Sequence, residues 1–147
     1  MGWLKKIGLA VVVIFVLLLL VGAISETQEE NTIKNAKTVP YTVVNFWSAH
    51  QPTAKRYSEN ILVSTTDHDQ IKLIAKKEIL KLKDDYSADV IWMNICTEVW
   101  EDNPKICKNE IARVTWIKDG VYPRPQVNPN AEDCGSFAGG KLYILWR

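Results

Sequence analysis

The sequence predicts an α+β fold: one helix packed on a small antiparallel-type sheet in the order β-β-α-β-β, preceded by a single N-terminal transmembrane helix. Three observations lead to this fold class. Residues 7–24 carry no charged or strongly polar side chain. Residues 67–86 repeat apolar side chains with the period of an amphipathic helix. Segments rich in β-branched and aromatic residues lie on both sides of that helix.

The apolar run over residues 7–24 is long enough to cross a bilayer. At about 1.5 Å of rise per residue a helix of this length spans roughly 27 Å, close to the thickness of the hydrocarbon core. Lys5 and Lys6 precede the run and acidic residues follow it, which favours a cytoplasmic N-terminus. We therefore expect a single-pass protein of the cytoplasmic (inner) membrane, in contact with membrane lipid through residues 7–24, with its C-terminal domain outside.

Residues 1–25 have two interpretations, an uncleaved membrane anchor or a secretory signal segment cut before Glu26. The apolar run is longer than that of most signal peptides, which favours the anchor. Residues 26–39 are polar and charged, as expected of a linker. Residues 40–147 are numerous enough for one exported domain with its own core. This domain has equal numbers of basic and acidic residues, which argues against nucleic acid as a partner.

The first half of the exported domain should contain two strands and the helix. Residues 41–47 and 56–63 are rich in β-branched and aromatic residues and could form a hairpin. The helix is expected to begin after Thr66, whose hydroxyl can cap it, and to reach about Tyr86. The side chains on its apolar face would be Ile71, Ile74, Ala75, Ile79, Leu82 and Tyr86.

The second half should contain two or three further strands. Residues 88–99 are apolar on both faces, which indicates a central strand. Residues 111–118 form another strand that ends at an Asp-Gly turn. The following segment is rich in proline and glycine and is expected to be irregular, although residues 142–146 could add a fifth strand at an edge of the sheet.

Residues 41–120 resemble small exported bacterial domains of unknown function that share the β-β-α-β-β order. The resemblance depends on the helix opening at residues 65–67, the strand segment 89–94 and the segment 111–120. It implies the fold and export, and it implies no activity.

The three cysteines all fall in the exported domain, where an oxidising environment permits a disulfide. Cys96 lies in an apolar strand and is expected to be a buried, reduced thiol. Cys107 and Cys134 lie in polar, loop-like segments that could meet. We favour a Cys107–Cys134 bridge, although spacing alone leaves the pairing open.

The sequence predicts no catalytic residue, metal site or cofactor. It has no C-x-x-C pair, and its histidines are His50 and His68. Residues 135–141 match the spacing of a phosphate-binding loop, but no hydroxyl residue or helix follows Lys141, so a turn is the better interpretation. The carboxylates at positions 67 and 69 suit the start of a helix better than a metal site.

Tryptophan is the unusual feature of the composition, because five of the six lie in the exported domain. One helix covers one face of a sheet, so several indoles could lie on the other face. There they would form either a core beneath the tail or an exposed surface that binds a partner. The candidate binding residues are Trp47, Trp92 and Trp116.

Two functions are compatible with this sequence. The favoured function is a non-enzymatic module that binds or inhibits another exported or membrane protein. The alternative is a small extracytoplasmic hydrolase whose site is built from scattered residues. Titratable groups gathered in a concave pocket would favour the hydrolase, and a tryptophan-bearing surface would favour the binding module.

Overall fold

The computed structural model describes residues 12, 14, 16 and 27–147. The chain divides into two compact units, residues 1–35 and 36–147. In the first unit, residues 27–35 are helical, within the segment expected to be a linker.

The prediction of a single-pass protein of the cytoplasmic membrane needs correction. Within the described part of the chain, no helix has both the length and the apolar character needed to cross a bilayer. The longest described helix has 19 residues and is amphipathic, with lysines on its exposed side. The predicted transmembrane segment, residues 7–24, lies mostly outside the described residues.

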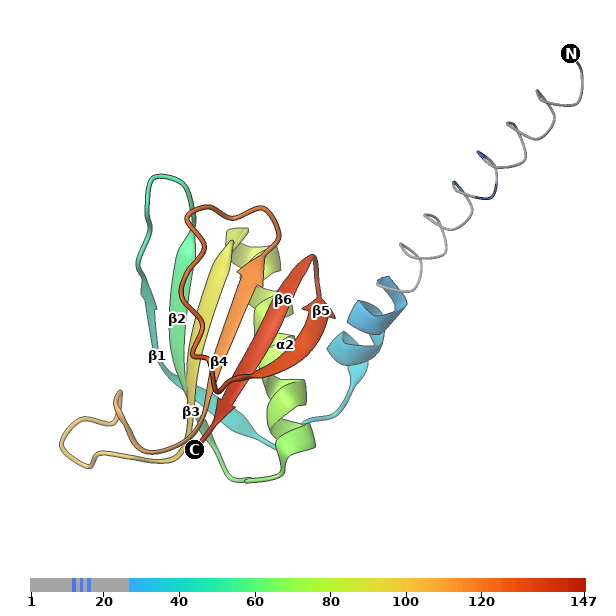
Figure 1. Ribbon diagram of the computed structural model, residues 1–147. Helices are drawn as coiled ribbons and strands as arrows, with labels where there is room; N and C mark the ends of the chain where they lie inside the picture. Colours follow the sequence, from blue (N-terminus) through green and yellow to red (C-terminus); the bar gives the residue numbers. More distant parts are fainter. Residues whose placement is uncertain (1–11, 13, 15, 17–26) are drawn as a thin grey trace, which may run out of the picture. The chain divides into compact units, whose positions relative to one another are not determined.

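Residues 36–147 form one mixed sheet of six strands with a helix, α2, behind it in the view of Figure 1. Across the sheet the strands follow the order β1-β2-β3-β4-β6-β5. Along the chain the elements are β1 Tyr41–Ser48, β2 Arg56–Val63, α2 His68–Tyr86, β3 Val90–Val99, β4 Cys107–Lys118, β5 Glu132–Phe137 and β6 Gly140–Trp146.

The predicted antiparallel-type sheet in the order β-β-α-β-β is wrong in two respects. First, β2 and β3 are parallel. Helix α2 returns the chain to the end of the sheet where β2 begins, so β3 runs in the same direction as β2. Second, the segment after residue 120 contains two strands, which pair as an antiparallel hairpin. β6 contains residues 142–146, expected as an edge strand, but it lies inside the sheet, and the edge is formed by β5, which was not expected. Ala138 and Gly139 both have positive φ, as a two-residue turn of type I′ requires.

Helix α2 begins one residue later than expected. Asp67 is the N-cap, and its carboxylate accepts hydrogen bonds from the backbone N–H groups of Asp69 and Gln70. The predicted apolar face is buried apart from Tyr86, which is 42% exposed. The buried residues of the helix are Ile71, Ile74, Ala75, Glu78, Ile79, Leu80 and Leu82.

The register of the strands sorts the side chains of the sheet into two faces. Ile61, Ile95 and Ala112 are neighbours across three strands, are fully buried and lie on the face that α2 covers. Side chains one residue away along each strand point to the other side, which we call the open face. Residues 119–131, which we call the tail, run in front of the sheet in Figure 1 and so cross the open face.

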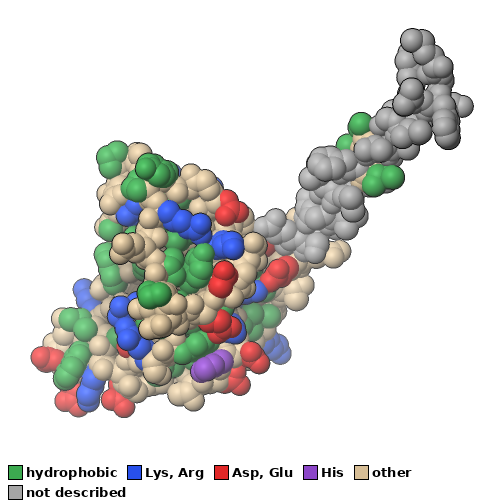
Figure 2. All heavy atoms as spheres, viewed as in Figure 1, with side chains coloured by type: hydrophobic (Ala, Val, Ile, Leu, Met, Phe, Trp, Pro, Cys, Tyr) green, Lys and Arg blue, Asp and Glu red, His purple; other side chains and the backbone are tan. Residues whose placement is uncertain are grey.

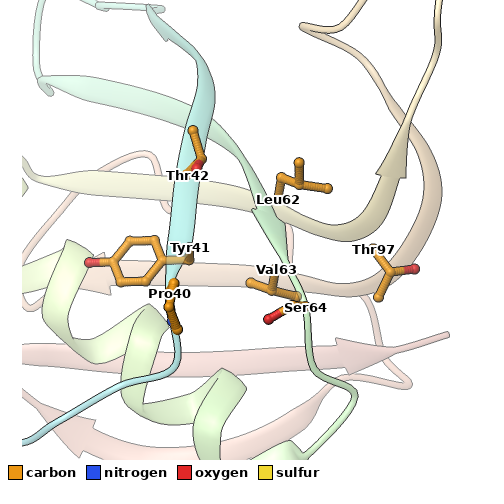
Figure 3. Close-up of a pocket in the computed structure, with 7 residues that line it drawn as sticks. All are labelled: Pro40, Tyr41, Thr42, Leu62, Val63, Ser64 and Thr97. Carbon is orange, nitrogen blue, oxygen red and sulfur yellow. The ribbon is translucent and has the colours of Figure 1, made fainter.

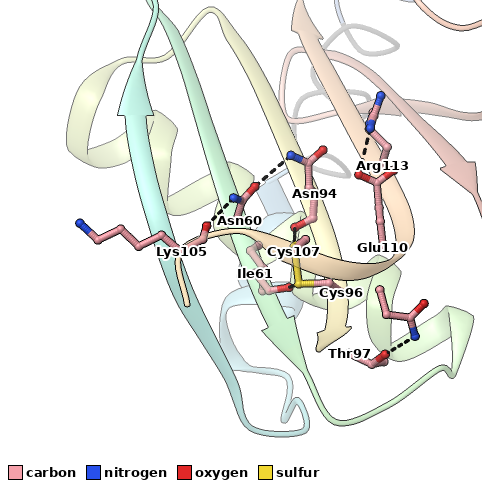
Figure 4. Close-up of a disulfide and its surroundings, with 10 residues drawn as sticks. Asn60, Ile61, Asn94, Cys96, Thr97, Lys105, Cys107, Glu110 and Arg113 are labelled. Atoms are coloured by element: carbon pink, nitrogen blue, oxygen red, sulfur yellow. Dashed lines mark hydrogen bonds and ion pairs between the residues drawn. A yellow bond between two sulfur atoms is a disulfide. The ribbon is translucent and has the colours of Figure 1, made fainter. Parts of the chain in front are cut away.

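A disulfide joins Cys96 to Cys107, with their Cα atoms 5.6 Å apart (Figure 4). Cys134 is free, so the pairing differs from the predicted Cys107–Cys134 bridge. The reason is that β4 begins at Cys107 rather than at residue 111, which places Cys107 beside β3. Register shifts in β3 after Ile95 disturb the regular pairing next to the two cysteines.

Candidate binding site on the open face

Trp116, one of the three candidate binding residues, is a core residue. It is fully buried on the face that α2 covers, and its indole N–H donates a hydrogen bond to the carbonyl of Phe137 at 2.8 Å. A Cβ atom on Gly140 would come within 2.7 Å of its ring, so the backbone of β6 packs directly on the indole. Trp116 is therefore not available to a partner.

Trp47 and Trp92, the other two candidates, lie on the open face. In the sheet register Trp47 is opposite Ser58, and Ser58 is opposite Trp92. The two indoles therefore belong to one row across the sheet, which continues through Thr115 to Tyr143. Trp47, on the edge strand β1, is 39% exposed.

A pocket of about 270 Å³ lies between the open face and the tail, and we call it the tail pocket. Side chains from three neighbouring strands and from the tail line it. The sheet contributes Trp92, Arg113, Thr115 and Leu145, and the tail contributes Gln126, Val127, Asn128 and Ala131. Seen from this side, Lys and Arg side chains lie among hydrophobic ones (Figure 2).

The tail is held beside the pocket by polar contacts. The guanidinium of Arg124 donates a hydrogen bond to the hydroxyl of Tyr143 at 3.0 Å. Further along the tail Asn128 closes a turn, because its backbone oxygen accepts from the N–H of Ala131 and its side-chain oxygen accepts from the N–H of Asn130. These contacts place Gln126, Val127 and Asn128 opposite the sheet.

A second segment covers the open face at β2. The side-chain amide of Asn94 donates to the side-chain oxygen of Asn60 at 2.9 Å, and the amide of Asn60 donates to the backbone oxygen of Lys105 at 2.7 Å (Figure 4). The loop of residues 100–106 is thereby fixed against this part of the face. The tail pocket lies on the other side of Asn94, towards β4 and β6.

Arg113 is the charged side chain of the tail pocket. Its guanidinium pairs with the carboxylate of Glu110 at 2.9 Å, and the same carboxylate pairs with Arg147 at 3.1 Å (Figure 4 shows the first pair). Two guanidinium groups thus share one carboxylate, which leaves an excess of positive charge. Since an arginine keeps its proton at any physiological pH, the pocket is suited to recognition rather than to acid–base chemistry.

A second, more open pocket of about 350 Å³ lies where β1 and β2 meet the end of β3 (Figure 3). Its walls are apolar or carry hydroxyl groups: Pro40, Tyr41, Thr42, Leu62, Val63, Ser64 and Thr97. The Tyr41 ring points away from Leu62 and Thr97 in Figure 3, and its hydroxyl donates to Glu78 of α2 at 2.6 Å. The Tyr41 hydroxyl, the ionisable group of this pocket, therefore points to the core and is bound there by Glu78.

Two carboxyl groups are buried between the sheet and α2. Glu59 and Glu78 are only 2% and 3% exposed, and each has a carboxylate oxygen without a hydrogen-bond partner, although that of Glu78 lies 3.5 Å from the ammonium group of Lys81. Burial and the neighbouring Glu78 carboxylate raise the pKa of Glu59 to about 7. Burial and Glu78 also raise the pKa of Tyr41 well above its usual value. The sequence contained a signal for Glu59, because this residue alternates with Tyr57 and Ile61 along a strand segment.

The remaining polar residues singled out in the sequence have structural partners. His50 accepts a hydrogen bond at Nδ1 from the backbone N–H of Arg56, and the His68 ring stacks on Trp146 at 3.7 Å. Lys141 lies 3.7 Å from the carboxylate of Asp133 on β5. Of the glycines before Lys141, Gly139 lies in the turn between β5 and β6, and Gly140 is the first residue of β6.

No protein-family model, curated protein or solved structure matches the chain.

Proposed function

We propose that this domain is a non-enzymatic module that binds another protein through its open face and so holds or inhibits it. The tail pocket carries the proposal. It combines an indole, Trp92, with a guanidinium, Arg113, and both side-chain types are enriched among the residues that dominate the energy of protein–protein interfaces. The exposed Trp47 in the same row would extend the contact surface beyond the pocket.

The size of the tail pocket supports a protein partner. Sites for small molecules usually enclose roughly 300–1,000 Å³, and the tail pocket is slightly smaller. It could accept one large side chain of a partner, with the side-chain amide of Gln126 and the side-chain nitrogen of Asn128 positioned to hydrogen-bond the partner's backbone.

The alternative, a small hydrolase, would need acid–base groups within reach of a substrate. The described residues do bring two carboxyl groups and a phenol together, at Glu59, Glu78 and Tyr41. Because both carboxyl groups are buried between the sheet and α2, this cluster is unsuited to bind a substrate, and we prefer the binding function.

The proposal can be tested by site-specific photocrosslinking in the cells that produce the protein. A benzophenone amino acid would replace Val127 in the tail pocket, Trp47 in the same row, or, as a control, the exposed Asp85 on α2. We expect adducts of the same mass from positions 47 and 127 and none from position 85. Equal adducts from all three positions, or no adduct from position 127, would contradict the proposal.

A tryptophan substitution makes the test specific for the pocket. Trp92→Ala should reduce the yield of the position-127 adduct by about tenfold or more, as expected for an interface hot spot worth about 2 kcal/mol. Trp100→Ala is the matched control, because Trp100 is 48% exposed in the loop of residues 100–106 and lies outside the pocket. Thermal unfolding of both variants would establish that each remains folded.

A further inference from the structure

Arg56 is a largely buried arginine that has no anionic partner among the described residues. The residue is only 8% exposed, and its Nε atom is buried without a hydrogen-bond partner. The guanidinium lies over the ring of Trp92, with its central carbon 5.9 Å from the ring centre. A cation–π contact offsets only part of the cost of removing a charge from water, so this site would gain from a bound anion.

Arg56 is on the same face of the sheet as the tail pocket. Arg56, Ser58 and Asn60 alternate along β2, so their side chains share one face of the sheet. That face is the open face, because Ser58 lies between Trp47 and Trp92 in the row across the sheet. Trp92 lines the tail pocket and also contacts Arg56, so one indole connects the guanidinium to the pocket.

The other open-face cations near the pocket already have polar partners. Arg113 pairs with Glu110 and Lys141 with Asp133. Arg124 donates to the hydroxyl of Tyr143. Among these cations of the described residues, Arg56 and Arg124 therefore have no anionic partner, and Arg56 is the buried one, whereas Arg124 is exposed.

We propose that Arg56 and Trp92 form a subsite for one carboxylate, supplied by an Asp or Glu side chain of the protein that occupies the tail pocket. This inference rests on the proposed function. One guanidinium without an anionic partner matches the single charge of a carboxylate. The two terminal nitrogens of Arg56 are not among the buried unpartnered atoms, and a guanidinium can use such a pair of N–H groups in a two-pronged contact with a carboxylate.

The subsite can be tested on the purified full chain by NMR, with the Arg56 Nε–H and Trp92 indole N–H signals as reporters. The probes are N-acetyl-glutamic acid amide and its neutral counterpart N-acetyl-glutamine amide. We expect saturable shifts of both signals with the acid, and binding of the glutamine probe that is at least about tenfold weaker. No saturable shift with the acid, equal responses to both probes, or tighter binding of inorganic phosphate would overturn the carboxylate assignment.

Two substitutions of Arg56 complete the experiment. Arg56→Gln should abolish the response of the Trp92 indole, and Arg56→Lys should not restore it, because an ammonium lacks the planar fork of donors. Since the guanidinium has no counter-charge to lose, Arg56→Gln should unfold at the same temperature as the parent or a higher one. A fall in the unfolding temperature, together with an unchanged probe response, would mean that Arg56 is only structural.

The crosslinking experiment separates this inference from the proposed function. If Arg56→Gln leaves the position-127 adduct at full yield, the partner binds without the carboxylate contact and the subsite is wrong, while the proposed function stands. If the parent chain gives no position-127 adduct, the proposed function is wrong, whatever the probes show.

Discussion

At the scale of single residues, the buried carboxyl group of Glu59 has the clearest consequence. It lies in β2 between two buried neighbours, Tyr57 and Ile61, and faces Glu78 of α2. A carboxylate cannot be buried beside another carboxylate without cost, so the folded state favours the protonated form. The stability of the domain should therefore depend on pH through this residue.

We predict that the free energy of unfolding falls as the pH rises between about 4.5 and 7. The pKa of Glu59 is about 7 in the folded state against 4.5 in the unfolded state, so the folded state binds the proton more tightly in this range. This difference in the pKa of Glu59 corresponds to a loss of unfolding free energy on the order of 3 kcal/mol. The loss is complete above about pH 7 and absent below the pKa of 4.5 that Glu59 has in the unfolded state. Urea unfolding at a series of pH values measures it.

Glu59→Gln should remove this pH dependence, because the amide resembles the protonated acid. At pH 8 the variant should be the more stable protein, and at low pH the two should be similar. The exposed Glu98, which lies 3.6 Å from Lys108, provides the control, since Glu98→Gln should change stability by less than about 1 kcal/mol at either pH. Parallel pH curves for the parent and Glu59→Gln would show that the carboxyl group titrates normally.

At the scale of elements, the sequence allowed prediction of those features that depend on local periodicity. The apolar face of α2 and the strands around Ile61 and Ile95 follow from spacing alone. The parallel pairing of β2 and β3 does not, because alternation in a strand is the same in either direction. The start of β4 at Cys107 was also missed, since residues 107–110 are polar and lack the apolar alternation of a half-buried strand. That error led to the wrong partner for Cys107.

We predict that reducing the Cys96–Cys107 bridge lowers the free energy of unfolding by about 3 kcal/mol, the chain-entropy value for a separation of 11 residues. Urea unfolding with and without a reductant measures the difference. Cys134→Ala should respond to the reductant as the parent does, because Cys134 is free. Non-reducing peptide mapping should link Cys96 to Cys107, and a bridge that contains Cys134 would refute the assignment.

At the scale of the whole domain, the sheet is covered differently on its two sides. Helix α2 buries one face under apolar side chains, whereas the tail and the loop of residues 100–106 cross the other face with a few hydrogen bonds. The candidate site could be foreseen only in part: Trp47 and Trp92 were named, but Arg56, Arg113 and the tail that completes the pocket were not. Contacts between residues so far apart in the chain leave no periodic pattern in the sequence.

The weakly held tail should open without unfolding the sheet. Tyr143→Phe removes the hydroxyl that accepts from Arg124, a contact worth about 1 kcal/mol. We predict severalfold faster hydrogen exchange at the amides of Asn130 and Ala131, measured by NMR, with exchange in β3 unchanged. Lys141→Ala, which removes the exposed pair with Asp133, should leave those two amides as they are. Unaltered exchange in Tyr143→Phe would show that other contacts hold the tail.

The order of strands in the sheet also bears on how the protein is made. β6 lies between β4 and β5, although the ribosome synthesises it after both. Until β6 has emerged, β5 has no neighbour to pair with, and the tail pocket lacks the wall that Leu145 provides. On the proposed function, a nascent chain could not capture a partner early, and binding would require that translation has passed through the strand that completes the sheet.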